Sequence, residues 1–268
     1  MTRLGWIAIN GFREAVRDKV MYSLVAFAVI LIGASYILGE LTAGQDIKIM
    51  KDLGLSAIGV FGLFMAIFIG IGLVSKEVEK RSVYALLAKP IRRGELVLGR
   101  YLGLVLTLAV NIAIMTVALY GLLAYLGWRL PENAKLALDT PLLDPRMLVA
   151  VGLTLLQLSM VTAVAVFFST FSTPILSAAL TFFVYVAGYF SQDLRNFDQV
   201  VDSKATQMLA RGLYYLLPGF SAFDVGAQVV HGLPLGAKYI AVTSAYGVTY
   251  IAILLVISIA IFSRRDFK

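Results

Sequence analysis

The chain has 268 residues, of which 60% are hydrophobic and only 15% are charged, and its mean hydropathy is +0.86. Soluble domains carry about 25% charged residues, and disordered chains have low hydrophobicity, so both classes are excluded. The absence of cysteine and the single histidine exclude disulfides, thiolate metal sites and multi-histidine metal sites. The sequence therefore predicts a polytopic membrane protein. In such a protein, the positions of the basic residues along the chain must be considered before the net charge of +7 is taken to indicate a nucleic-acid partner.

The first predicted element is a helix over residues 3–18. Leu4, Ile7 and Phe12 fall on one face of it, whereas Arg3 and Arg13 fall on the other. Such a pattern is typical of a helix that lies in the membrane interface. A charged flank that only sets the topology explains the pattern equally well.

Six apolar segments follow, and a helix needs about 20 apolar residues to cross the hydrocarbon. The fifth segment is the shortest. The segments cover residues 20–38, 53–74, 96–126, 148–168, 175–190 and 239–262. The predicted fold is all-α, with six transmembrane helices in one transmembrane domain over residues 1–268.

The basic residues set the predicted orientation. They gather in the N-terminal segment, in the loop after the second apolar segment and at the C-terminus, whereas the loop after the fourth segment has none. Because cytoplasmic loops carry an excess of Lys and Arg, both termini are predicted to be cytoplasmic.

Polar groups are rare in the middle of the segments. The amides of Asn111 and Gln157 lie at depth, and for both we favour interhelical hydrogen bonding over substrate contact. Gly62, Ala66 and Gly70 share one helix face, which suits either packing within the chain or a dimer seam. The scarcity of ionisable groups argues against an ion-driven carrier and an intramembrane enzyme, and no catalytic, cofactor or metal site is predicted.

The loop after the second segment is the most informative stretch, and from Ser75 it reads SKEVEKRSVYALLAKPIRRGELVLGRYLG. Glu77 and Arg81 can pair on a helix, an apolar group with Leu86 and Leu87 follows, and Pro90 redirects the chain. A loop that only sets topology needs neither the apolar group nor the acidic residues. The pattern therefore favours a docking surface for a cytoplasmic partner.

The long segment before the last span has two predicted features. An amphipathic helix over residues 205–217 would lie on the outer leaflet and end at Pro218. The run YYLLPGFSAFD (residues 214–224) would form a corner that dips into the membrane. A second helix would follow, with Phe223, Val225, Val229 and Val230 partly buried.

Taken together, these strings resemble the membrane permease subunits of type-2 ABC exporters over nearly the whole chain. Residues 3–18 resemble the elbow helix of that family, and LLPGFSAFD resembles its segment before the last span. The charged loop resembles its coupling helix, where an acidic residue, a basic residue, Leu-Leu and Pro-[Ile/Val]-x-Arg recur. The positions expected to contact the ATPase are Glu77, Glu79, Arg81, Leu86, Leu87, Pro90, Arg92 and Arg93.

The resemblance implies a permease that is not itself an enzyme. It would work with two copies of a cytoplasmic ABC ATPase and a second permease half, identical or related, in a prokaryotic plasma membrane, without nucleic acid. A second coupling element is expected at Ser169–Pro174 (STFSTP), where contacts would be made through hydroxyls and backbone. The loop over residues 39–52 is short, unlike that of family members with large extracellular domains.

Two alternatives remain open. A non-transporting membrane scaffold that recruits cytoplasmic partners needs the same docking surface, and an intramembrane enzyme is less favoured. The apolar spans hint at a lipid-like or amphipathic cargo.

Overall fold

The computed structural model describes residues 3–16, 19–40, 46–79, 93–131, 140–191, 212 and 217–264. The regular secondary structure in these residues is helical. In chain order the elements are α1 (Arg3–Val16), α2 (Lys19–Glu40), α3 (Asp46–Glu79), α5 (Arg93–Arg129), α7 (Arg146–Ser169), α8 (Pro174–Tyr189), η2 (Phe220–Phe223), α11 (Gly226–Val230) and α12 (Ala237–Arg264).

Within the described residues, five helices are long and apolar enough to cross a membrane: α2, α3, α5, α7 and α12. The prediction of an all-helical membrane protein is therefore confirmed in its coarse form. The helix α8 is apolar but has only 16 residues, fewer than the about 20 that a full crossing needs.

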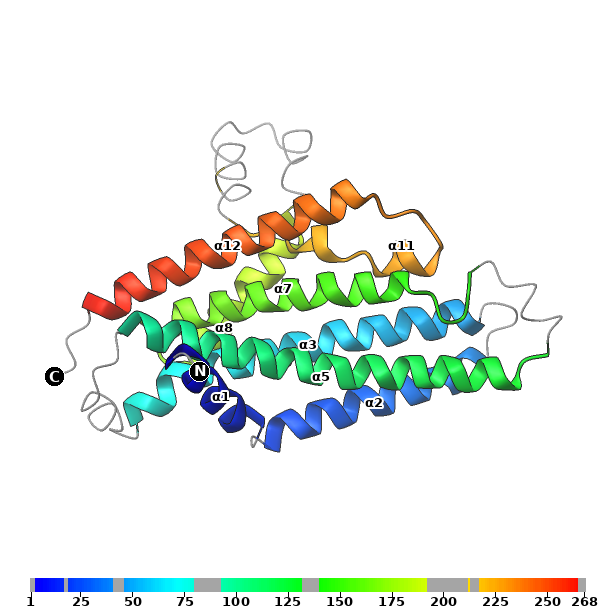
Figure 1. Cartoon of the computed structure of the whole chain (residues 1–268), viewed down its shortest axis with the longest axis horizontal. Coiled ribbons are helices and arrows are strands. Elements are labelled where there is room, and N and C mark those ends of the chain that lie inside the picture. Colours follow the sequence, from blue (N-terminus) through cyan, green and yellow to red (C-terminus); the bar gives the residue numbers. More distant parts are fainter. Residues whose placement is uncertain are drawn as a thin grey trace.

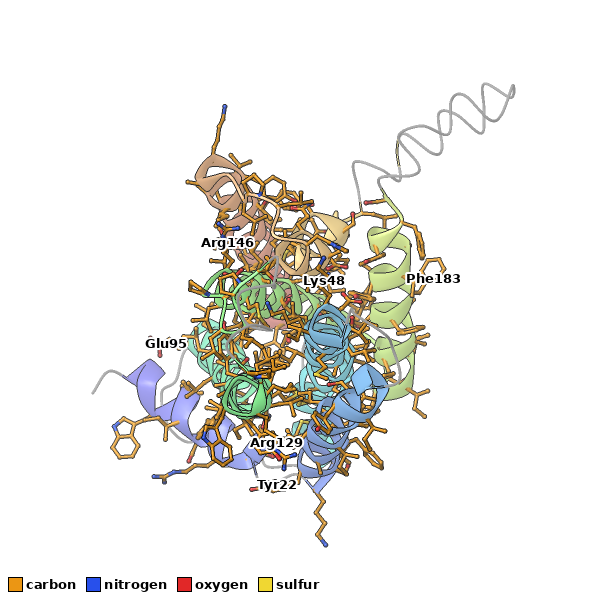
Figure 2. All side chains as sticks on the ribbon, turned by 90° about the vertical axis from the view of Figure 1, so that its right-hand side faces the viewer. Tyr22, Lys48, Glu95, Arg129, Arg146 and Phe183 are labelled. Atoms are coloured by element: carbon orange, nitrogen blue, oxygen red, sulfur yellow. The ribbon has the colours of Figure 1, made fainter. Side chains whose placement is uncertain are left out.

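The long helices form an elongated bundle, with α3, α5 and α7 side by side at its centre (Figure 1). The helix α2 packs on α3 and α5, and α12 packs on α7 and α5. We call the end that holds α1 and the α7–α8 turn the α1 end, and the opposite end the Arg129 end. Viewed from the Arg129 end, α8 stands at one side of the bundle and Phe183 points away from it (Figure 2).

Glycines allow two of the close helix contacts. The predicted stripe of Gly62, Ala66 and Gly70 lies on the buried face of α3. A Cβ on Gly70 would collide with the Cβ of Ala165, and one on Gly62 would collide with a methyl group of Leu158. The stripe therefore packs against α7 of the same chain, which occupies this face.

The helix α1 packs across the first turns of α5, at the α1 end (Figure 1). A Cβ on Gly103 would lie 2.5 Å from the carbonyl oxygen of Ala8 and 3.0 Å from the backbone nitrogen of Phe12. Glycine at this position lets the two backbones meet. The helix predicted over residues 3–18 is described as a helix over Arg3–Val16, and Trp6 on it is 63% exposed.

The helices extend beyond the apolar segments from which they were predicted. The helix α3 begins at Asp46 instead of residue 53, and α5 runs from Arg93 to Arg129 instead of residues 96–126. Hydropathy falls where polar residues begin, but the backbone hydrogen bonds of a helix continue through them. As a result Lys48, Lys51 and Asp52, which the sequence places in a loop, belong to a helix.

The segment before α12 enters the bundle. Phe220 and Phe223 are both 0% exposed, and Val225, Val229 and Val230 are buried rather than partly buried. The predicted second helix is divided here into η2 and α11. Residues 214–216 of the predicted membrane-dipping corner lie outside the described residues, as does nearly all of the helix predicted over 205–217. The placement of this corner in the membrane stays a prediction.

Candidate functional site

The predicted docking string begins and ends at the α1 end of the bundle. Glu77 and Glu79 lie in the last turn of α3, and Arg93 is the first residue of α5. The other predicted contact positions lie outside the described residues: Arg81, Leu86, Leu87, Pro90 and Arg92. The end of α3, the start of α5 and the α7–α8 turn all lie at this end (Figure 1).

The α7–α8 turn is the predicted second coupling element, Ser169–Pro174. The hydroxyls of Ser169 and Thr170 donate to the carbonyls of Val166 and Phe167, at 2.8 and 2.7 Å, so both are bonded within the end of α7. Pro174 begins α8, a position where its missing N–H costs nothing. Ser169 and Thr170 are buried, whereas Phe171 is 47% exposed, so this turn presents an aromatic ring rather than these two hydroxyls.

A second candidate site is a cavity of about 380 Å³ between α3, α7, α8 and the segment from Asp224 to Ala227. We call it the central cavity. It is lined by Asp52, Leu55, Ser56, Gly59, Val60, Leu63, Ala150, Thr154, Gln157, Tyr185, Tyr189, Asp224, Gly226 and Ala227.

Hydrogen bonds fix the wall of the central cavity that contains Asp224. The Tyr189 hydroxyl at the end of α8 donates to Asp224 Oδ2 at 2.6 Å. The backbone N–H of Gly226 donates to Asp224 Oδ1 at 3.4 Å. A carboxylate can accept about four hydrogen bonds, so Asp224 keeps acceptor capacity for a further donor.

Gln157 marks the deep part of the cavity. Its Nε2 donates to the carbonyl oxygen of Phe220 at 3.1 Å, and its side chain is 6% exposed. At 1.5 Å per residue Gln157 lies about 17 Å from the start of α7, so the Phe220 segment reaches the middle of this helix. Gln157 thus bonds another element and also lines the cavity. Asn111, the other amide predicted at depth, lies half-buried on α5 and is not a lining residue.

The sequence analysis did not identify Lys51 as a buried residue. Its side chain is 1% exposed, and Nζ donates to Thr140 Oγ1 at 3.1 Å and to the carbonyl oxygen of Pro141 at 2.7 Å. Nearby, the Tyr120 hydroxyl donates to the carbonyl of Asp144 at 2.8 Å. These bonds tie α3 and α5 to the residues before α7, at the Arg129 end.

The lining residues Asp52, Tyr185, Tyr189 and Asp224 were also missed. Asp52 lies on α3, Tyr185 and Tyr189 lie four residues apart on α8, and Asp224 lies between η2 and α11. No local spacing relates either carboxylate to the other or to the tyrosines. One signal was available: Asp52 directly precedes the apolar segment over residues 53–74, and Tyr189 lies at the end of the segment over residues 175–190.

Comparisons with known proteins complete the description. The comparison with curated proteins gives no match. A family model described as "ABC-2 family transporter protein" matches residues 5–267, nearly the whole chain. This match agrees with the all-helical, strongly apolar bundle. The chain therefore belongs to the ABC-2 transporter family, as a permease component of membrane transport.

Proposed function

We propose that this chain is the permease subunit of an ATP-driven exporter, which forms the translocation path and is driven by a separate cytoplasmic ATPase. The observation that carries the proposal is the gathering of the end of α3, the start of α5 and the α7–α8 turn at one end of the bundle (Figure 1). These three places flank or contain the two predicted coupling elements. One partner docked at the α1 end would reach both elements.

The proposed coupling follows from helix geometry. The charged string between α3 and α5 continues directly into two helices of 34 and 37 residues. A helix transmits a displacement along its length, so movement of the string by the ATPase would shift both helices. Two ATPase copies and a second permease half, identical or related, would complete the transporter.

The proposed membrane topology has six spans, with α8 as the short one and both termini in the cytoplasm of a prokaryotic cell. The α1 end then faces the cytoplasm, and α1 is the elbow helix in the interface. The exposed Trp6 supports this placement, because tryptophan is enriched at headgroup depth.

Charge reversal in the string tests the coupling. We expect Glu77→Lys and Arg81→Glu each to reduce the ATPase rate of the reconstituted complex about tenfold or more, because each places two like charges four residues apart in the string proposed to dock the ATPase. The double exchange should restore part of the rate. Glu14→Lys, on the exposed face of α1, is the matched control and should keep the rate.

Two outcomes would contradict the proposal. Unchanged ATPase rates in both single variants would remove the coupling role of the pair. Purification of the chain alone, under conditions that preserve known complexes, would remove the energy source. A complex that contains the ATPase but shows no vanadate-sensitive flux would favour the scaffold alternative.

A further inference from the structure

We propose that the central cavity binds an organic cation, with an ammonium group between Asp52 and Asp224 and an apolar body along α3. The inference deepens the proposed function, because this ligand would be the cargo or a mimic of it. Binding itself, however, requires no ATPase.

The charge of the lining supports a cation. Two of the lining residues, Asp52 and Asp224, are carboxylates, and none is Lys, Arg or His. Lys51 directly precedes Asp52 on the helix, but its ammonium group bonds Thr140 and Pro141 outside the lining. Lys48 lies one turn nearer the start of α3 than Asp52, and it is not a lining residue either.

Two tyrosines in the lining are a second feature that suits an ammonium group. The rings of Tyr185 and Tyr189 line the same cavity, and aromatic faces attract cations. The bond from the Tyr189 hydroxyl to Asp224 holds one ring and one carboxylate together. An ammonium group there would meet a carboxylate and an aromatic ring that are already in place.

The rest of the lining requires an apolar body. Leu55, Val60 and Leu63 follow Asp52 along α3, and Ala150 faces the cavity from α7. From Asp52 to Leu63 the helix rises about 17 Å, at 1.5 Å per residue. An inorganic ion would fill only the acidic part. The volume of about 380 Å³ lies in the range of small-molecule sites, which is about 300–1,000 Å³.

The test measures binding to the purified full-length chain in nanodiscs of uncharged phosphatidylcholine. The probe is benzyltriethylammonium, followed by isothermal titration calorimetry, and the matched anion is benzenesulfonate. We expect saturable binding of the cation and none of the anion. Asp52→Asn and Asp224→Asn should each weaken binding about tenfold, a loss of about 1.4 kcal/mol, because each removes one charge at nearly constant shape.

The matched control is Glu14→Gln, which removes a carboxylate from the exposed face of α1, far from the cavity, and should bind like the unaltered chain. Thermal unfolding of each variant checks its fold, and Asp52→Asn alone decides if Asp224→Asn does not fold. Equal binding of both probes, no binding of the cation, or equal affinity in Asp52→Asn and Glu14→Gln would overturn the inference.

The outcomes for the cavity and for the function are separable. Probe binding by a chain that recruits no ATPase would keep the site and remove the transport function. A chain that couples to an ATPase but does not bind the probe would keep the proposed transport function and remove the cation site.

Discussion

Lys51 illustrates at the residue scale how a local pattern and a tertiary position can differ. It lies just before the apolar segment over residues 53–74, a place that suggests a solvated cation in a loop. In the structure it lies on α3 and bonds residues 89 and 90 positions away. Its burial depends on the chain segment that precedes α7, which no periodicity within α3 describes.

Replacement of this lysine should destabilise the Arg129 end. Lys51→Met keeps a long unbranched side chain but leaves the Thr140 hydroxyl and the Pro141 carbonyl without this donor, at a cost of about 1–3 kcal/mol. We expect a lower apparent Tm in detergent, measured by differential scanning fluorimetry. The exposed Lys238→Met is the control. Equal Tm values for the two variants would show that the lysine contributes nothing.

Gln157 makes another long-range hydrogen bond, and the loss of this bond should have a measurable effect. Gln157→Leu removes the donor to the Phe220 carbonyl, so the buried segment around Phe220 should open more often. We expect faster hydrogen–deuterium exchange over residues 217–225, by about three- to tenfold, since a net hydrogen bond contributes about 1 kcal/mol.

The matched control for this experiment is Thr154→Val. Thr154 lies one turn away on α7, and its hydroxyl bonds the carbonyl of Ala150 in its own helix at 3.0 Å. Thr154→Val should leave the hydrogen–deuterium exchange of residues 217–225 unchanged. The same exchange in both variants would mean that the aromatic packing, and not the amide, holds the segment.

At the element scale, the contact between α3 and α7 depends on glycine and alanine, whose side chains are absent or small. Leu158, Thr162 and Ala165 on α7 lie opposite Gly62 and Gly70 on α3. Hydrophobic surface drives little association between helices in lipid, so such close contacts supply much of the attraction.

Three alanine substitutions on α3 should therefore differ in their effect. Gly70→Ala meets the Cβ of Ala165, which cannot rotate away, and should cost about 1–3 kcal/mol. Gly62→Ala meets a methyl group at the end of Leu158, which can move, and should cost less. Gly59→Ala has nothing within 4 Å and should be neutral or stabilising. The order of Tm values measures this, and any other order contradicts the proposed packing.

At the scale of the whole molecule, the absence of cysteine allows a direct test of topology. Leu233→Cys, at the Arg129 end, should react with a membrane-impermeant maleimide in intact cells, because the positive-inside rule places that end outside. Thr173→Cys, in the α7–α8 turn, should react only after the cells are opened. The reverse pattern would invert the proposed orientation.

Local composition was enough to predict the membrane class and the approximate position of every long helix, because each apolar segment reports its own burial. The helices α3 and α5 run beyond the apolar segments over residues 53–74 and 96–126, since hydropathy does not mark where a helix stops. The central cavity was not predicted at all. Its members, such as Asp52 and Asp224, meet only when α3, α8 and the segment after η2 are assembled, and that assembly is a property of the folded chain.

The close seam between α3 and α7 has a mechanical consequence. Close contacts at Gly62 and Gly70 hold α3 and α7 together, so we expect the two helices to move together. The helix α8 is joined to α7 by the short turn Ser169–Pro174, which is the natural place for a pivot. A swing of α8 about this pivot would open or close the central cavity on its α8 side, relative to α3 and α7. The size of a ligand in the central cavity would then limit how closely α8 can approach α3 and α7.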